Sequence, residues 1–216
     1  VYRLLSEIEV ADNPTRAFEY SELLKANLLR DRIERSVLKP RPDLSDSIRN
    51  KLLATSRNYI EGKEDEAALT ELENGIVTDK QTGSKQTHDF STQNLELPKD
   101  VTIVSYEFTP SGQLLAFVLE SAKPLRAVKL PVNEVEAAKL ASETQTKIRD
   151  RIFFKIDGKK IYDLLLKPLE LKSNHLVIVP DKLLWRIPFH ALSPDGNKYL
   201  IETNTVSYSP SVYLLK

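Results

Sequence analysis

The sequence of 216 residues contains no cysteine and no methionine, and it has only three histidines. The absence of cysteine excludes disulfide bonds and leaves these residues without a thiolate nucleophile. It also favours a cytoplasmic setting, where proteins rarely depend on disulfides. His88, His175 and His190 have no recognisable metal-ligand spacing, since no cysteine completes a set. We therefore predict neither a metal site nor a cofactor.

Glycine is also scarce, and charge of neither sign dominates. The six glycines are never spaced as a dinucleotide-binding or phosphate-binding loop, so nucleotide binding has no support. Basic and acidic residues number 31 each, so the net charge indicates neither a nucleic-acid partner nor an anionic membrane. No apolar run approaches the length of a membrane span, and we expect no membrane association. A hydrophobic content of 41% is enough for a real core.

The N-terminal third of the sequence has the apolar spacing of helices. Asn13 can cap a helix over residues 14–39, which has proline at its first position. Two prolines then break the pattern, and residues 44–75 resume it. The segment that follows is polar and rich in serine and threonine, as is typical of a loop. We predict a helical region over residues 1–75 and a flexible linker over residues 76–94.

The hydrophobic period changes after the linker. Residues 101–108 alternate between apolar and polar side chains and are rich in β-branched residues. A tight turn follows, and residues 113–119 have the pattern of a second strand. This pattern predicts a β-hairpin. A third strand is predicted over residues 125–130.

Two helices are predicted next. The first covers residues 133–151 and has Val135, Ala138, Leu140 or Ala141, and Ile148 on its inner side. The second covers residues 161–169 and follows a turn at Asp157 and Gly158.

The last forty residues begin with a strand. Residues 175–179 form an unbroken run of leucine and β-branched side chains, apart from His175 at its start, closed by Pro-Asp. This suits a strand buried on both faces of a parallel sheet. A short helical turn is predicted over residues 189–192, and two short strands over residues 199–202 and 205–208. The fold class is therefore α/β: a helical N-terminal region followed by a mixed sheet flanked by helices.

Four ordered segments carry a resemblance to a known family. They are LVIVPD at residues 176–181, LWRIPFHAL at 184–192, YLIE at 199–202 and VSYSPS at 206–211. Their order resembles the opening of a CHAT domain, the caspase-like domain that usually follows tetratricopeptide repeats. The family prefers glycine after the Pro-Asp, whereas this chain has Lys182, which leaves the turn type open.

Weaker resemblance extends toward the N-terminus. Residues 17–31 resemble the helix that closes a repeat array. Residues 104–120 resemble the hairpin ahead of the peptidase core, and residues 161–170 resemble the helix before the first core strand. The resemblance implies that residues 95–216 are the N-terminal part of a CHAT domain and the incomplete start of a caspase-like fold. It also implies that residues 1–75 end a repeat array and connect it to this domain.

The resemblance implies an activity for the complete domain, that of a caspase- or separase-type cysteine peptidase with a His-Cys dyad. In the family both dyad residues lie downstream of the VSYSPS segment. We therefore expect the chain to be an N-terminal portion that has no catalytic residue and is inactive alone. The alternative is a non-enzymatic interaction or scaffold module, so the sequence leaves open whether the parent is an enzyme.

Trp185 and Arg186 are the candidate site residues. They could line a cleft or contact a partner, which would be a polypeptide substrate or another protein. The alternative is that the tryptophan belongs to the core and the arginine is its solvated neighbour. His175 is interpreted as a strand-end residue. His190 lies in the IPFHAL segment, where the family match is structural, so the catalytic histidine of the family is not assigned to it.

Overall fold

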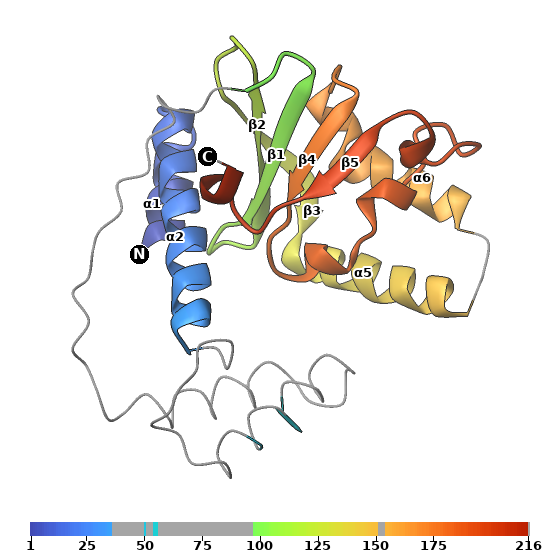
Figure 1. The fold of residues 1–216 in the computed structure, drawn as a ribbon, viewed down its shortest axis with the longest axis horizontal. Helices are drawn as coiled ribbons and strands as arrows, with labels where there is room; N and C mark the ends of the chain where they lie inside the picture. Colours follow the sequence, from blue (N-terminus) through green and yellow to red (C-terminus); the bar gives the residue numbers. More distant parts are fainter. Residues whose placement is uncertain (36–49, 51–53, 56–96, 151–153, 216) are drawn as a thin grey trace. The chain divides into compact units, whose positions relative to one another are not determined.

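The structure is a computed structural model that describes residues 1–35, 50, 54, 55, 97–150 and 154–215 (Figure 1). The chain divides into two compact units, one of residues 1–26 with 89–216 and the other of residues 27–88. The predicted linker and nearly all of the second predicted helical block lie outside the described residues, so both stay predictions. The fold described below is that of the first unit.

A five-stranded mixed sheet forms the centre of this unit, with strand order β3-β2-β1-β4-β5. Strands β1, β2 and β3 pair in antiparallel fashion, whereas β4 is parallel to both β1 and β5. β1 therefore joins a hairpin half of the sheet to a parallel half. The strands are β1 Val101–Phe108, β2 Gln113–Glu120, β3 Arg126–Asn133, β4 His175–Val179 and β5 Thr205–Tyr208. These pairings confirm the predicted α/β class and the parallel strand at residues 175–179.

The predicted β1–β2 hairpin is closed by a turn that needs glycine. Gly112 has a φ of +84°, a conformation that costs glycine little because it has no Cβ. Its N–H donates to the carbonyl oxygen of Thr109 at 2.9 Å. Seven pairs of facing residues then run from Phe108 with Leu114 to Thr102 with Glu120.

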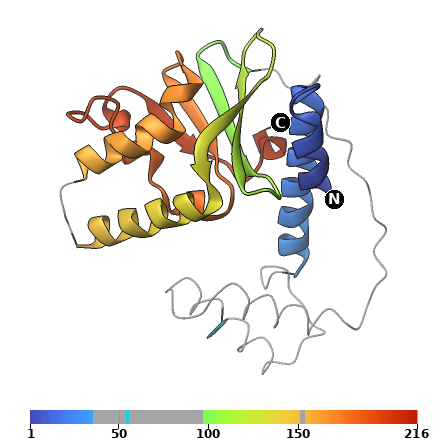
Figure 2. The same cartoon turned by 180° about the vertical axis from the view of Figure 1, so that it is seen from behind.

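Helices cover both faces of the sheet (Figures 1 and 2). Helices α1 (Tyr2–Glu9) and α2 (Pro14–Arg35) pack on one face, and α5 (Glu134–Arg149) and α6 (Lys155–Leu165) pack on the other. Successive residues of β1 consequently enter different layers, since strand side chains alternate between faces. Val104, Tyr106 and Phe108 join the core under α5 and α6, whereas Ile103 joins the core under α2.

The start of α2 is as predicted, because the Asn13 side chain accepts from the Arg16 N–H at 3.0 Å. The helix α1 lies within the predicted helical region, although no separate helix was predicted before residue 14. It has Arg3 and Ser6 directed toward the sheet, while Leu4 and Ile8 are exposed, so its apolar spacing does not mark its buried face.

Helix α5 begins with a capping box between Asn133 and Glu136, which agrees with its predicted start. The prediction of its inner face was correct at Ala141 and wrong at Val135 and Ile148. Val135 is 79% exposed and Ile148 is 47% exposed, whereas Ala137, Ala141 and Thr144 are buried. The short alanine side chains allow the helix to pack closely, and the larger apolar residues remain outside.

Two local predictions were also wrong. Residues 199–202 were predicted as a strand, but Leu200–Glu202 form a 3-10 helix, η5. The Glu202 carboxylate accepts from the Tyr199 N–H at 2.7 Å, and this side chain-to-backbone bond turns the chain. Gly158 was predicted in a turn but lies inside α6, where a Cβ would stand 3.2 Å from the Ala191 carbonyl oxygen. The glycine serves close packing rather than a turn.

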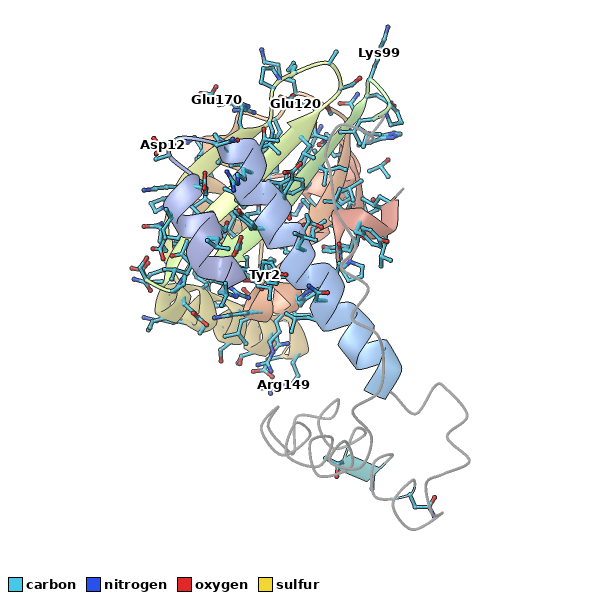
Figure 3. The ribbon with its side chains drawn as sticks, turned by 90° about the vertical axis from the view of Figure 1, so that its left-hand side faces the viewer. Tyr2, Asp12, Lys99, Glu120, Arg149 and Glu170 are labelled. Carbon is cyan, nitrogen blue, oxygen red and sulfur yellow. The ribbon has the colours of Figure 1, made fainter. Side chains whose placement is uncertain are left out.

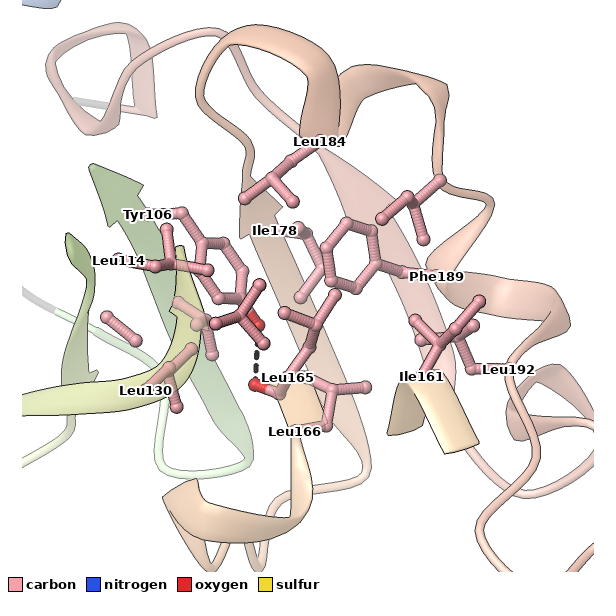
Figure 4. Packing of buried hydrophobic residues seen from close by; sticks show 14 of the residues in the cluster. Tyr106, Leu114, Leu130, Ile161, Leu165, Leu166, Ile178, Leu184, Phe189 and Leu192 are labelled. Atoms are coloured by element: carbon pink, nitrogen blue, oxygen red, sulfur yellow. Dashed lines mark hydrogen bonds between the residues drawn. The ribbon is translucent and has the colours of Figure 1, made fainter. Parts of the chain in front are cut away.

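The core under α5 and α6 includes aromatic side chains (Figure 4). The Tyr106 hydroxyl donates to the carbonyl oxygen of Leu165 at 3.0 Å, so this fully buried hydroxyl is paired. Phe189, in the 3-10 helix η4 (Phe189–Ala191), lies with its ring centroid 5.5 Å from that of Tyr106. These contacts anchor the loop after β4 to the sheet.

Candidate functional site

Trp185 and Arg186 lie in the 3-10 helix η3 (Lys182–Arg186), which directly follows β4. Trp185 is 48% exposed and Arg186 is exposed. Their neighbour Leu184 is fully buried and fastens the helix to the core. A large aromatic ring and a guanidinium are thereby presented to solvent from a short, anchored segment.

Tyr208, the last residue of β5, lies beside Trp185. Its ring centroid is 6.5 Å from that of Trp185 and 6.2 Å from that of His190. Because β4 and β5 are parallel, their carboxyl ends meet at one edge of the sheet. We call Trp185, Arg186, His190 and Tyr208 the carboxyl-edge surface. Open α/β sheets bind ligands outside the carboxyl ends of their strands, so this is the candidate site.

Hydrogen bonds hold the Tyr208 hydroxyl in place. The backbone N–H of His190 donates to Tyr208 Oη at 3.3 Å, and His190 Nδ1 lies 3.0 Å from the same oxygen. Burial raises the pKa of Tyr208, while the backbone amides of His190 and Phe189 act in the opposite direction. The roles of donor and acceptor between Tyr208 Oη and His190 Nδ1 depend on the tautomer of the imidazole.

A second polar cluster lies on the opposite face of the sheet, under the N-terminal helices whose side chains Figure 3 shows. Glu22 of α2 is fully buried. One of its carboxylate oxygens accepts from Ser105 Oγ at 2.9 Å and from Lys25 Nζ at 3.2 Å. The other accepts from Ser211 Oγ at 2.7 Å and from the Val212 N–H at 2.6 Å. Glu22 thus joins α2, β1 and the segment after β5.

This cluster contains a pair that resembles a Ser-Lys catalytic dyad, because Lys25 Nζ lies 2.5 Å from Ser105 Oγ. The environment argues against catalysis. Ser105 is fully buried within a central strand and gives its proton to Glu22, so no substrate can reach it. The cluster therefore stabilises the packing of α2 and is not the candidate site.

Two more carboxylates lie near this interface. Asp181, after β4, accepts two hydrogen bonds from Arg3, at 2.8 and 3.0 Å, and one from the Phe108 N–H at 2.9 Å. The turn that it opens places Lys182 at a φ of +46°, the left-handed region where glycine is favoured. Lys182 Nζ bonds Glu134 at 2.6 Å, which helps to hold this conformation. The turn type that the sequence left open is thus one in which a lysine takes the left-handed conformation.

Glu107 is buried, and only one of its two carboxylate oxygens accepts a hydrogen bond among the described residues. Its Oε2 accepts from Ser6 at 2.9 Å, whereas Oε1 has no hydrogen-bond partner among the described residues. Burial raises the pKa of Glu107, and the nearby Ser21, Lys25, Ser6 and Arg3 oppose this rise. The folded state therefore binds the proton of this carboxyl more tightly than the unfolded state does.

This gives a pH-dependent prediction for Glu107→Gln. Because the folded-state pKa is raised, the carboxyl favours folding at low pH, and this contribution is lost as pH rises above the ordinary glutamate value of about 4.3. The glutamine variant has no such loss. We expect its free energy of unfolding to rise relative to the unmodified chain between about pH 4 and pH 8, measured by urea denaturation. Parallel profiles would contradict the raised pKa.

Other features of the described residues offer no competing site. A cavity of about 240 Å³ lies near the amino ends of β1 and β4, but its lining is mainly polar and Lys123 is paired with Glu120 at 3.0 Å. No group of three or more acidic or histidine side chains in the described ranges could hold a metal ion. None of the described helices has the length and apolar content needed to cross a bilayer.

Comparison with known protein families finds that the CHAT domain model matches residues 155–216. The predicted resemblance to a CHAT domain is thus confirmed over these residues. The CHAT segment comprises α6, β4, β5 and the 3-10 helices between and after them, and it contains the whole carboxyl-edge surface. It is only part of a domain. No curated protein matches the chain. The resemblance of residues 1–75 to a repeat array stays a prediction.

The sequence placed Trp185 and Arg186 in the candidate site but missed Tyr208 as their neighbour. It also interpreted His190 as structural and gave no sign of its contact with Tyr208. The signal that was available was the order of residues within the CHAT segment, because His190 follows β4, Tyr208 ends β5, and these two strands are parallel neighbours. The Glu22 cluster was missed entirely.

Proposed function

We propose that this chain supplies part of the structural framework of a caspase-like cysteine peptidase, and that the carboxyl-edge surface binds the polypeptide on which the complete protein acts. The observation that supports this most is the position of the surface. It lies within the CHAT segment, at the edge of the sheet where parallel strands end. The chain has no cysteine, so the nucleophile of such an enzyme would have to come from other residues.

The composition of the surface suits a polypeptide ligand. Tryptophan, tyrosine and arginine are the residues that most often dominate the free energy of protein binding. Here Trp185 and Tyr208 expose 48% and 37% of their surface from positions fixed by buried neighbours. Rigid aromatic groups lose little conformational entropy when they bind.

The first test is direct binding. Trp185 is the single tryptophan of the chain, so its emission reports on this surface alone. Reduced and alkylated α-lactalbumin, labelled with a dye, serves as an unfolded polypeptide probe in anisotropy titrations. We expect Trp185→Ala to weaken binding at least about tenfold, as for an interface hot spot. The control Ile148→Ala removes an equally exposed apolar side chain on α5 and should bind as the unmodified chain does. Equal affinity of both variants would overturn the proposal.

A second candidate function is a non-enzymatic interaction module, which the exposed aromatic surface also favours. The two functions differ in a reaction rather than in binding. The protein that contains this chain, captured from its source with an antibody to residues 97–216, would be treated with an iodoacetamide probe and assayed for cleavage of the same polypeptide. Labelling with cleavage supports the peptidase. Binding without either supports the module.

A further inference from the structure

We infer that the cavity at the amino ends of β1 and β4 binds the phosphate group of a phosphate monoester. The cavity has a volume of about 240 Å³ and lies at the opposite end of the parallel strands from the carboxyl-edge surface. The inference does not depend on the proposed polypeptide binding. It follows from the cations and hydrogen-bond donors that converge on the cavity.

Three separate segments of the chain each bring a lysine to this cavity. Lys99 precedes β1, Lys123 lies in the turn between β2 and β3, and Lys172 precedes β4. They meet because β2 is antiparallel to β1, which puts the carboxyl end of β2 beside the amino ends of β1 and β4. Figure 3 labels Lys99 and Glu120, the last residue of β2, at this end of the sheet.

Glu120 also lines the cavity, but cations of the chain already neutralise its charge. One of its carboxylate oxygens lies 3.0 Å from Lys123 Nζ, and the other lies 3.5 Å from a guanidinium nitrogen of Arg126. One carboxylate is thus shared by two cations. This group leaves a net positive charge at the cavity.

The other two lysines add to this charge. The amino groups of Lys99 and Lys172 form no ion pair or hydrogen bond with the part of the chain that the structure describes. Asp100 is the remaining acidic residue of the lining, and its carboxylate lies 3.5 Å from His175 Nδ1. Positive charge is therefore in excess, and this excess attracts an anion.

Hydroxyl groups complete the site. Ser173 Oγ accepts from Thr102 Oγ1 at 2.6 Å, so its own proton is left for a ligand. The Ser121 hydroxyl has no partner among the described residues. A phosphate monoester offers three acceptor oxygens and nearly two negative charges at neutral pH, so it matches both the hydroxyls and the lysines. Lysine binds phosphate as a point charge and needs no planar partner.

The cavity is pre-formed and small. The His175 N–H donates to the Asp100 carbonyl oxygen at 3.2 Å, and Asn204 Nδ2 donates to the Ser173 carbonyl oxygen at 3.1 Å. These bonds fix the segments before β1 and β4. The volume lies below the range of about 300–1,000 Å³ that is usual for pockets that enclose a whole small molecule. The cavity therefore fits a terminal phosphate group better than the base and sugar of a nucleotide.

The test is calorimetric titration of the unmodified chain with inorganic phosphate and with acetate at pH 7.5 and low ionic strength. We expect phosphate to bind at least about tenfold more tightly, because its charge and its acceptor oxygens both exceed those of acetate. The affinity should decrease as sodium chloride is added, because the lysines are exposed.

The double variant Lys99→Gln with Lys172→Gln should weaken phosphate binding at least about tenfold. The matched control is Lys139→Gln with Lys160→Gln, which removes the same charge from exposed positions on α5 and α6 and should keep the affinity. Asp100→Asn should strengthen binding, since it removes a negative charge from the lining. Equal binding of phosphate and acetate, or equal losses in the two double variants, would overturn the inference.

Two further probes distinguish the sources of the phosphate monoester. O-phosphoserine represents a small molecule, and an acetylated and amidated peptide with one phosphoserine represents a modified protein. Tighter binding of the peptide supports a phosphorylated protein, and equal binding supports a small phosphorylated molecule. If both bind no more tightly than serine and the unphosphorylated peptide, the phosphate site is wrong. Trp185→Ala should leave phosphate binding unchanged, so failure here is separate from failure of the proposed polypeptide binding.

Discussion

Replacing Glu22 with alanine is expected to lower the free energy of unfolding by about 3–5 kcal/mol, the usual effect of breaking a buried ion pair from one side. Without the carboxylate, Lys25 keeps a largely buried charge that has lost its counter-ion. Ser211 Oγ and the Val212 N–H lose their acceptor at the same time. Urea denaturation followed by circular dichroism measures the change.

Glu22→Gln distinguishes charge from shape. The amide keeps the volume of the side chain, but its NH₂ group must face donors, since both carboxylate oxygens accept hydrogen bonds in the structure. We therefore expect the free energy of unfolding of the glutamine variant to lie between that of the unmodified chain and that of the alanine variant. The control Glu143→Gln alters a 52% exposed side chain on α5, paired with Lys139 at 3.9 Å, and should change stability by less than about 0.5 kcal/mol. Equal effects at positions 22 and 143 would contradict the buried cluster.

The second large effect is expected for Phe189→Ala, at about 3–5 kcal/mol of lost stability. The ring is fully buried, and Figure 4 shows it beside Ile178 in the core under α5 and α6. Its removal leaves a cavity next to Tyr106, whose ring lies 5.5 Å away. It also removes the aromatic edge that contacts Tyr208 at 6.4 Å, so the carboxyl-edge surface should bind its polypeptide more weakly.

Ile156→Ala is the control for Phe189, because it removes an apolar side chain that is 61% exposed. It should change the unfolding free energy by less than about 0.5 kcal/mol. A loss for Phe189→Ala that is no larger than this would mean that η4 is not anchored to the sheet.

The sequence predicted the elements whose signal is local. Residues 101–108, 175–179 and 205–208 were expected as strands and have these bounds, because alternating or continuous β-branched runs between turn residues mark them. The prediction failed where a side chain competes with the backbone. At Tyr199 and Glu202 one such hydrogen bond outweighs the strand propensity of the sequence YLIE.

The candidate site was only half predictable for a different reason. Trp185 and Arg186 stand out by residue type, but their contact with Tyr208 depends on β4 and β5 being parallel neighbours. The Glu22 cluster was less accessible still, because Glu22 meets Ser105 across 83 positions of the chain. Strand periodicity shows that Ser105 and Glu107 share a face, yet it does not show which helix covers that face.

The Glu22 cluster also sets an order of events during protein synthesis. Ser211 follows Glu22 by 189 positions, so at about 5–20 residues per second the ribosome makes them roughly 10–40 s apart. Throughout that interval the carboxylate has water in place of Ser211 and Val212. Helix α2 can therefore complete its docking only after the segment beyond β5 has left the ribosome. A nascent chain that ends before Ser211 should present α2 to proteases, so this helix would become protected only after the strands that it covers have been made.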